Sequence, residues 1–291
     1  MIDPAMRLRP PVYWENILFL LLTHLAGLFS FVYLIFIQFS IWTLGLGLLW
    51  MALCMLSTTG GYHRLFAHRS YRSATIVRLF YLLFGAASFQ SSALRWASDH
   101  RAHHAHTDEA EDPYNIKRGF WWAHLGWLFY RSPPSDYRNA RDLQADPLIR
   151  FQDRFYLFLA IAVGMALPAA IGTLWGDPLG ALLLAGFGRL LVQYHATFSI
   201  NSVAHTVGRR PYSLSTSARD SFVAALATLG EGYHNFHHRF PSDYRNGIRF
   251  HQFDPTKWCV WLLSRIHLTW DLKRAPAESI LKARQSVDSE T

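Results

Sequence analysis

Eight of the fifteen histidines of the chain fall into three short clusters that border apolar stretches. The clusters read His63-Arg-Leu-Phe-Ala-His68, His100-Arg-Ala-His103-His104 and His234-Asn-Phe-His237-His238. Neutral imidazole is the commonest protein ligand of transition metals, and sets of several histidines suit iron, zinc or copper. No cysteine-rich or carboxylate-rich cluster competes for this role, since Cys54 and Cys259 are the two cysteines of the chain. The clusters therefore predict a metal centre.

The spacing inside the clusters indicates how many metals they hold. The second and third clusters place histidines three and four positions apart, which puts each trio on one helical face. His63 and His68 are five apart. We expect this looser interval at a frayed helix end, because the preceding Gly60-Gly61 pair weakens a helix. A single zinc takes three or four protein ligands, so eight histidines predict two metals.

Two further residues are candidates for the same centre. His205 follows the last apolar stretch in the segment Asn201-Ser-Val-Ala-His205 and is a ninth candidate ligand. Asn201 lies one helical turn earlier and could hold a metal-bound water or orient a ligand. His106 is not expected to be a ligand, because it lies two positions beyond His104 and on another face of the helix.

Four apolar segments must position these residues. They comprise residues 17–39, 41–60, 155–175 and 179–203, and each is long enough to cross a bilayer, for which about 20 residues are needed. The joints within each pair are short and contain no Lys or Arg, so each pair is predicted to form a helical hairpin. The mean hydropathy of +0.07 fits a few spans together with a large water-facing part.

The positive charges predict the orientation of the chain in the membrane. Thirteen Lys and Arg residues lie between Arg64 and Arg154, and twelve more follow the fourth span. The positive-inside rule then places both termini and all three clusters in the cytoplasm, on a bacterial inner membrane or, in a eukaryote, the endoplasmic reticulum. No cleaved signal peptide is expected. Arg189 falls within the fourth span, where we expect it to partner backbone carbonyls.

The segments between and after the hairpins predict a cytosolic cap. The run from Thr75 to Trp96 has the apolar spacing of a helix but is too short to span, and the aromatic run 119–130 suits the lipid headgroup layer. The cap is expected to comprise about 61–154 and 204–275. The predicted fold class is thus an all-α integral membrane protein, four transmembrane helices under a cytosolic helical cap, as one domain over 1–291.

The motifs resemble those of the membrane fatty acid desaturase family, most closely its stearoyl-CoA (acyl-CoA Δ9) branch. The similarity rests on His-Arg-Leu-Phe-Ala-His, Asp-His-Arg-Ala-His-His, Asn-Ser-Val-Ala-His and Gly-Glu-Gly-Tyr-His-Asn-Phe-His-His, and extends over about 14–270. It implies two iron ions. One would be held by His63, His68, His100, His104 and His237, and the other by His103, His205, His234, His238 and, through a water, Asn201.

The resemblance also implies the reaction and its partners. Such enzymes use O₂ and two external electrons to introduce a cis double bond into a saturated long-chain acyl group. The electrons would come from a separate carrier of the ferredoxin or cytochrome b5 type with its reductase, which the basic surface could dock. The net charge of +8 also favours anionic membrane lipids. Nucleic acid is not indicated, because the basic residues alternate with membrane segments.

The substrate residues are likewise implied by the resemblance. A bend in the acyl tunnel would lie at Gln90, Trp96 and Thr197, favouring a Δ9 cut, and the closed end near Met51 and Met55. The family's headgroup contacts are kept at Asn16, Asp99 and Arg131. They are replaced at Ser91, Ser98 and Ser132, where close relatives carry an amide, an Arg and a Lys, so attraction to the phosphates of coenzyme A should be weaker. Acyl-CoA is the first expectation, and the acyl chain of a phospholipid or of an acyl-carrier protein is the second.

Two other functions are compatible with a histidine-rich membrane protein. A di-iron hydroxylase or ketolase shares the oxidant but returns OH to the substrate, and the form of the third cluster argues against it. A metal transporter or sensor would place its ligands near the bilayer midplane, whereas these clusters lie at the ends of the spans on one side.

Overall fold

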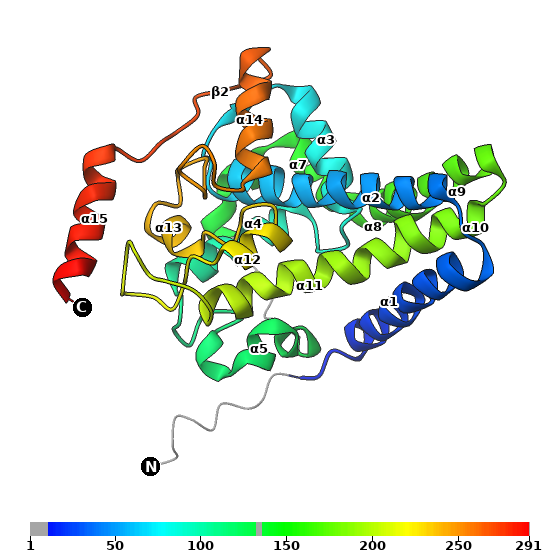
Figure 1. Cartoon of the computed structure of the whole chain (residues 1–291), viewed down its shortest axis with the longest axis horizontal. Coiled ribbons are helices and arrows are strands. Elements are labelled where there is room, and N and C mark those ends of the chain that lie inside the picture. Colours follow the sequence, from blue (N-terminus) through cyan, green and yellow to red (C-terminus); the bar gives the residue numbers. More distant parts are fainter. Residues whose placement is uncertain (1–10, 132–135, 291) are drawn as a thin grey trace.

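The computed structural model describes residues 11–131 and 136–290, and these are mostly helical (Figure 1). The first half contains α1 (Trp14–Val32), η1 (Tyr33–Ile37), α2 (Ile41–Leu56), η2 (Ser57–Ala67), β1 (Arg72–Ser73), α3 (Thr75–Ala86), α4 (Ala93–Ala105), η3 (Ile116–Arg118), α5 (Phe120–His124), η4 (Gly126–Phe129), η5 (Arg138–Ala140) and α6 (Arg141–Ala145). The second half contains α7 (Pro147–Arg154), α8 (Tyr156–Ile161), η6 (Ala162–Ala166), α9 (Leu167–Gly172), η7 (Thr173–Trp175), α10 (Pro178–Ala181), η8 (Leu182–Gly188), α11 (Arg189–Ser202), η9 (Val203–His205), α12 (Phe222–Ala227), α13 (His234–Arg239), α14 (Pro255–Arg265), β2 (Thr269–Trp270) and α15 (Ala277–Glu290).

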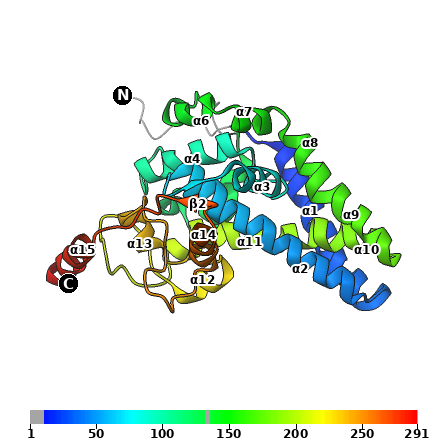
Figure 2. The ribbon, with the colours of Figure 1, turned by 90° about the horizontal axis from the view of Figure 1, so that it is seen from above.

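The long helices extend together to one side of the molecule as an arm (Figure 2). Three of them are long and apolar enough to cross a membrane: Trp14–Ile37, Ile41–Ala67 and Tyr156–Trp175. The fourth expected span is also helical, in α10, η8 and α11. It is not among the candidate spans of the described residues, because polar side chains such as Arg189 and Gln193 lower its hydropathy.

Asp177 joins the two hairpins at the end of the arm. It is buried, and its carboxylate accepts hydrogen bonds from Tyr33 (3.0 Å) and Thr43 (2.6 Å) of the first hairpin. It also caps α10 by accepting from the amide of Gly180 at 2.9 Å. One carboxylate therefore satisfies donors from both hairpins in an apolar setting, where an unpaired donor would be costly.

Arg189 has the structural role expected of it. Its guanidinium is buried and donates to the carbonyl oxygens of Ala185 (2.6 Å), Ala87 (2.7 Å) and Gly164 (3.3 Å). The carbonyl of Ala185 lies in η8, which continues into α11. That of Ala87 lies at the end of α3, and that of Gly164 lies in η6, between α8 and α9. The charge thus ties three helices together through their backbones.

The expectation that the second span ends at Gly60 in a frayed turn is wrong. The helix continues to Ala67 as the π-helix η2, which is buried along its whole length. The glycines serve close packing, since a Cβ on Gly61 would stand 2.5 Å from the Cβ of Tyr81 on α3. The glycine pair therefore lets α3 approach the backbone of the second span.

The expected single helix from Thr75 to Trp96 is also interrupted. Helix α3 ends at Ala86, and α4 begins at Ala93, capped by the side chain of Ser92. Within the break, Phe89 and Ser91 have positive φ angles of 52° and 78°. The aromatic run 119–130 likewise forms two short pieces, α5 and η4, rather than one helix. The break between α3 and α4 frees Gln90 from a helix.

The remaining helices gather at the other end of the arm (Figure 1). We call α4, α12, α13, α14 and their connecting segments the helical head. Its main apolar core packs α3, α4 and α14 against η2, with Tyr62, Tyr81 and Val260 among its fully buried members. Helix α15 lies apart from the head but buries Ala283 against Tyr212 and Phe236, so it covers the outer side of α13.

Candidate metal centre

Nine histidines from η2 and its C-cap and from α4, η9 and α13 converge where the arm meets the helical head, in two groups. In each group one ring nitrogen per residue lies within 4.8 Å of the others. The first group contains His63, His68, His100, His104 and His237. The second group contains His103, His205, His234 and His238. The division is the same as the one that the resemblance implies.

Local helix geometry explains how each group forms. In η2 the amide of His68 donates to the carbonyl of His63 at 3.1 Å, an i→i+5 bond of the π-helical kind. This bond brings two residues five apart onto one face, so the irregular spacing of the first cluster is matched by an irregular helix. Helix α4 sends His100 and His104 to the first group and His103 to the second. The two groups are therefore neighbours across one helix.

The distances between ring nitrogens fit ligands of a shared cation. In the first group the Nε2–Nε2 distances are 2.8 Å (His68–His100) and 2.9 Å (His63–His237 and His237–His104). In the second group they are 3.1 Å for His205–His234, with 3.0 and 3.3 Å at its other edges. Two nitrogens bound at right angles to one cation, each at about 2.1 Å, are about 3.0 Å apart. The donor set thus fits a metal in each group.

The protonation of the rings also fits metal binding. His63 donates through Nδ1 to Glu231 and His103 through Nδ1 to Asp112, which leaves each Nε2 as a lone pair facing other nitrogens. Burial, and then the neighbouring imidazoles, lowers the pKa of most of these histidines below the usual value, and lowers the pKa of His205 to about 3. The affected residues are His68, His100, His104, His205, His234, His237 and His238. Neutral imidazole is the metal-binding form.

Three carboxylates behind the histidines were not identified from the sequence. Glu231 accepts from His63 Nδ1 at 2.8 Å, and Asp112 accepts from His103 Nδ1 at 2.9 Å. Asp108 acts at one remove: it accepts a hydrogen bond from Ser217, whose hydroxyl contacts His205 Nδ1 at 2.7 Å. Glu231 stands three residues before His234, which is a possible signal, whereas Asp108 and Asp112 lie in an acidic polar run of a kind that is usually solvated.

Glu231 is itself fixed by a buried charge network. Arg64, which is 1% exposed, contacts Glu231 at 2.9 Å and Asp254 at 3.0 Å. Asn246 donates to the other oxygen of Glu231 at 2.6 Å. Burial alone would raise the pKa of Glu231, but the interactions with the His63 ring and the Arg64 guanidinium outweigh it and lower the pKa to about 2. The carboxylate is therefore ionised at any working pH and holds the ring of His63 in place.

A cavity of about 630 Å³ runs past both histidine groups. His63 and His100 of the first group and His103 and His234 of the second line it. The volume lies in the range of small-molecule sites. The cavity gives both groups access to one bound ligand.

The residues expected to bend the substrate lie together on the cavity wall. Gln90 donates to Thr197 at 3.0 Å from the break between α3 and α4. Trp96 stacks on His100 with ring centroids 4.9 Å apart and faces His63 edge-on at 6.1 Å. A wide aromatic surface thus lies directly against the first histidine group.

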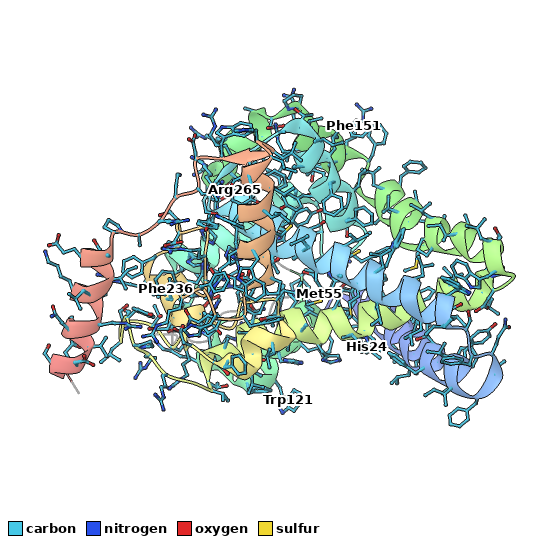
Figure 3. The ribbon with its side chains drawn as sticks, turned by 45° about the horizontal axis from the view of Figure 1, so that its top comes forward. His24, Met55, Trp121, Phe151, Phe236 and Arg265 are labelled. Carbon is cyan, nitrogen blue, oxygen red and sulfur yellow. The ribbon has the colours of Figure 1, made fainter. Side chains whose placement is uncertain are left out.

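Of the two residues expected at the closed end of the acyl tunnel, one lines this cavity, and so does the residue expected to hold a metal-bound water. Met55 lines it where the head joins the arm (Figure 3), whereas Met51, one turn earlier, is not among the lining residues. Asn201 lines the cavity together with His103 and His234 of the second group.

Polar residues also line the cavity. Asn16 donates to the carbonyl of Leu128 at 2.7 Å, Arg131 pairs with Glu15 at 2.8 Å, and Asp99 pairs with Arg95 at 2.8 Å. Asn16, Asp99 and Arg131 all line the cavity.

The three serine positions differ from one another. Ser91 lines the cavity, and its backbone amide donates a hydrogen bond to the hydroxyl of Tyr156. Ser98 is buried and hydrogen-bonded to Asn139, away from the cavity lining. Ser132 lies outside the described residues. His106 forms a separate, largely exposed group with Glu109 and Glu111, and exposed acidic groups of this kind are common without a metal.

Comparison with known proteins decides the family. Residues 39–262 match the fatty acid desaturase family model. The chain belongs to the fatty acid desaturase family. The match begins after the first apolar helix and includes the second span, the second hairpin and every histidine of the two groups.

The relatives are named as desaturases of acyl-CoA. A probable acyl-CoA desaturase of Schizosaccharomyces pombe is 42% identical over 82% of this chain and 51% of its own length. Stearoyl-CoA desaturase 5 of Bos taurus is 35% identical over 96% of this chain and 84% of its own. An acyl-CoA Delta12-desaturase of Acheta domesticus is 35% identical over 95% and 79%. The chain spans about half the length of the yeast relatives it matches.

Proposed function

We propose that the protein is an O₂-dependent acyl-CoA desaturase that introduces a cis double bond at Δ9 of a saturated long-chain acyl group. The observation that carries the proposal is one cavity lined by histidines of both groups. The names of the relatives supply the acyl-CoA substrate class. The Delta12 enzyme of Acheta domesticus, at 35% identity, means that the bond position needs its own argument.

The proposed metal is iron, one ion in each histidine group, with Asn201 acting on the second through a water. Iron in such a site supplies the O₂ chemistry needed to attack unactivated C–H bonds, for which no side chain is a sufficient oxidant. The chain supplies the neutral imidazoles and the carboxylates that orient them, Glu231 for His63 and Asp112 for His103.

The chain's further contribution is to position the substrate. A saturated chain presents many equivalent methylenes, so a rigid and dry tunnel must select one pair. Trp96 lies against His63 and His100, and the Gln90–Thr197 hydrogen bond fixes the cavity wall nearby. This arrangement supports a bend of the acyl chain beside the first group and therefore a mid-chain cut.

The headgroup is proposed to be coenzyme A, with the acyl chain of a phospholipid as the second candidate. The two arginines that line the cavity, Arg95 and Arg131, are each paired with a carboxylate of the chain. Paired cations attract phosphate less strongly than free ones. This observation favours weaker recognition of an anionic headgroup and keeps the phospholipid alternative open.

The proposed topology has four spans, both termini in the cytoplasm and the helical head as a cytosolic cap within a single domain. The three apolar helices support this topology. The hydrogen bonds from Arg189 to backbone carbonyls let the fourth helix tolerate a charged side chain. All nine histidines lie at the head end of the arm, which suits electron delivery by a separate carrier in the cytoplasm.

The test is expression in a host that lacks its own desaturase, followed by double-bond mapping of the total lipids. Monounsaturated Δ9 chains are expected. Hydroxylated chains would instead support a di-iron hydroxylase, and metal flux into vesicles without lipid oxidation would support a transporter. Parallel assays of the purified protein with stearoyl-CoA and with a saturated phospholipid decide the headgroup, and turnover of the phospholipid alone would contradict the acyl-CoA proposal.

A further inference from the structure

Three histidines outside the metal centre meet where α1, α5 and α11 come together. His24 lies on α1, on the side that faces α11 (Figure 3), His195 lies on α11, and His124 is the last residue of α5. We call these three residues the outer trio. Ionisable side chains are rare within membrane helices, and where they occur they usually mark a functional site. The outer trio is therefore a candidate site of its own.

Two members of the outer trio face each other through their ring nitrogens. Nε2 of His124 lies 3.0 Å from Nδ1 of His195. Neighbouring ring nitrogens within the two histidine groups of the metal centre are 2.8–3.3 Å apart. The pair in the outer trio thus has the separation of two nitrogens that can share one cation.

Ser202 fixes the protonation of the His124 ring. Its hydroxyl donates to a backbone carbonyl of its own helix at 3.0 Å, so its oxygen accepts from His124 Nδ1 at 2.8 Å. His124 Nε2 is then a lone pair directed at His195. Ser217 stands behind His205 of the second group in the same way, with its hydroxyl 2.7 Å from Nδ1. A histidine anchored through one nitrogen in this manner presents the other nitrogen to a metal.

His24 shows the same arrangement on α1. Its Nδ1 lies 2.7 Å from the carbonyl oxygen of Leu20, which can only accept, so the neutral ring carries its proton on Nδ1. Nε2 is therefore a lone pair. This nitrogen is buried and has no hydrogen-bond partner among the described residues, which is a costly state for a polar atom. A cation beside it would satisfy the lone pair.

The third side of the outer trio is less closed than the metal centre. His24 meets His195 edge-on at 86°, with ring centroids 5.3 Å apart, much as His205 meets His103 and His238 at 5.5 and 5.4 Å. The three nitrogens of the trio, however, are not all within 4.8 Å of one another, unlike those of the two groups. Because His195 is exposed, its ring can turn and close the trio on a cation.

We propose that the outer trio is a binding site for a divalent cation of the zinc type, separate from the metal centre and independent of the proposed reaction. Imidazole suits Zn²⁺, Cu²⁺ and Ni²⁺, whereas Mg²⁺ and Ca²⁺ bind mainly through oxygen ligands. Three histidines leave the fourth position of a tetrahedral zinc to a water. Because His195 must turn, zinc should bind here reversibly and less tightly than a metal in the two histidine groups.

The site would join three parts of the cavity wall. Leu20 of α1, Phe198 of α11 and Leu128 of η4, which follows α5, all line the cavity that passes the two histidine groups. One histidine of the outer trio lies on α1, one on α11 and one on α5. A bound zinc would therefore hold these elements together in the folded state, and it should raise the Tm because the unfolded chain lacks the site.

The experiment adds Zn²⁺ to the purified protein with its own metals bound, and measures zinc affinity by competition with a zinc indicator and metal content by mass spectrometry. The wild type should bind about one zinc per chain with its iron content unchanged. His195→Ala and His124→Ala should each weaken zinc binding at least about tenfold, because loss of a direct ligand costs no less than loss of an outer partner. His195 is exposed, so its substitution should leave the fold intact.

His106→Ala is the matched control, because His106 forms an exposed group with Glu109 and Glu111 that could itself hold a cation. This variant should bind zinc like the wild type. In thermal melts, zinc should raise the Tm of the wild type and of His106→Ala but not that of His195→Ala.

Four results would overturn the site in the outer trio. They are no added zinc in the wild type, wild-type affinity in both His195→Ala and His124→Ala, loss of zinc binding in His106→Ala, and release of iron in step with zinc uptake. The last result would place the zinc in the metal centre.

Discussion

The carboxylate of Glu231 offers a direct test of how the protein orients its metal ligands. In the wild type, His63 Nδ1 lies 2.8 Å from a carboxylate oxygen of Glu231. Glu231→Gln keeps the shape of the side chain and an oxygen that can accept this hydrogen bond, but it removes the charge. Because Glu231 has a pKa of about 2, the substitution changes the charge at every usable pH. Arg64 keeps its contact with Asp254 at 3.0 Å, so the fold has a remaining anchor.

The expected magnitude follows from the two roles of this carboxylate. Mutation of a carboxylate that hydrogen-bonds to a metal-bound histidine typically lowers metal affinity by about 10- to 100-fold, which corresponds to about 1.4–2.7 kcal/mol. Weakening the charge-assisted bonds to Arg64 adds about 1.5–3 kcal/mol of lost stability. Glu231→Gln should therefore fold at a lowered Tm and lose iron to a chelator more readily than the wild type.

The assay is a competition titration with a chromophoric chelator, run beside a thermal melt. Asp243→Asn is the matched control, because Asp243 is also buried and pairs with Arg245 at 2.8 Å but contacts no histidine among the described residues. It should lower the Tm and leave iron affinity unchanged. Wild-type iron affinity in Glu231→Gln, or an equal loss in Asp243→Asn, would refute the reasoning.

Three further substitutions test the ligands, the hairpin contact and the helix approach. His103→Ala should abolish desaturation and leave membrane insertion intact, and residual wild-type turnover in membrane fractions would count against its role as a ligand. Asp177→Ala leaves the buried Thr43 hydroxyl without its acceptor, while Tyr33 keeps Gln38 at 3.1 Å, and should cost about 1–3 kcal/mol in thermal unfolding. An unchanged Tm would remove the proposed link between the hairpins. Gly61→Ala brings a Cβ within 2.5 Å of Tyr81 and should destabilise the protein by about 1–3 kcal/mol, whereas Gly45→Ala, with open space around it, should not. Equal melting of these two variants would contradict the packing argument.

The apolar helices of the arm could be predicted from the sequence, because their long apolar runs are visible in the local hydropathy. Three of the expected spans are helices long and apolar enough to cross a membrane. The histidines were also recognisable, because clusters at fixed spacing are a local property of the chain. Their division into two groups came from the family resemblance, since spacing alone places the three histidines of α4 on one face.

The departures have tertiary causes that local patterns do not contain. The π-helix η2 contains two glycines and three Ser or Thr residues, a composition that disfavours a helix, and close packing of Gly61 on Tyr81, rather than a sequence signal, accompanies the extension of that helix. The break between α3 and α4 requires positive φ angles at Phe89 and Ser91, residue types that seldom adopt them. Surrounding structure must hold such a conformation, and the break places Gln90 in the cavity wall.

The carboxylates behind the histidines show the same limit. Asp112 and Glu231 are distant in sequence from the rings that they orient, His103 by nine residues and His63 by 168. A charged residue in a polar segment is usually solvated, and only the fold reveals that these two are buried.

The two histidine groups are proposed to hold two iron ions, and the measurement that tests this most directly is the metal content of the purified protein. Mass spectrometry of the metals should give about two iron atoms per chain. His205→Ala, which leaves the second group with three histidines, should lower this value towards one while the first group stays loaded. Zinc in place of iron, or a single iron per chain in the wild type that His205→Ala does not change, would contradict the account.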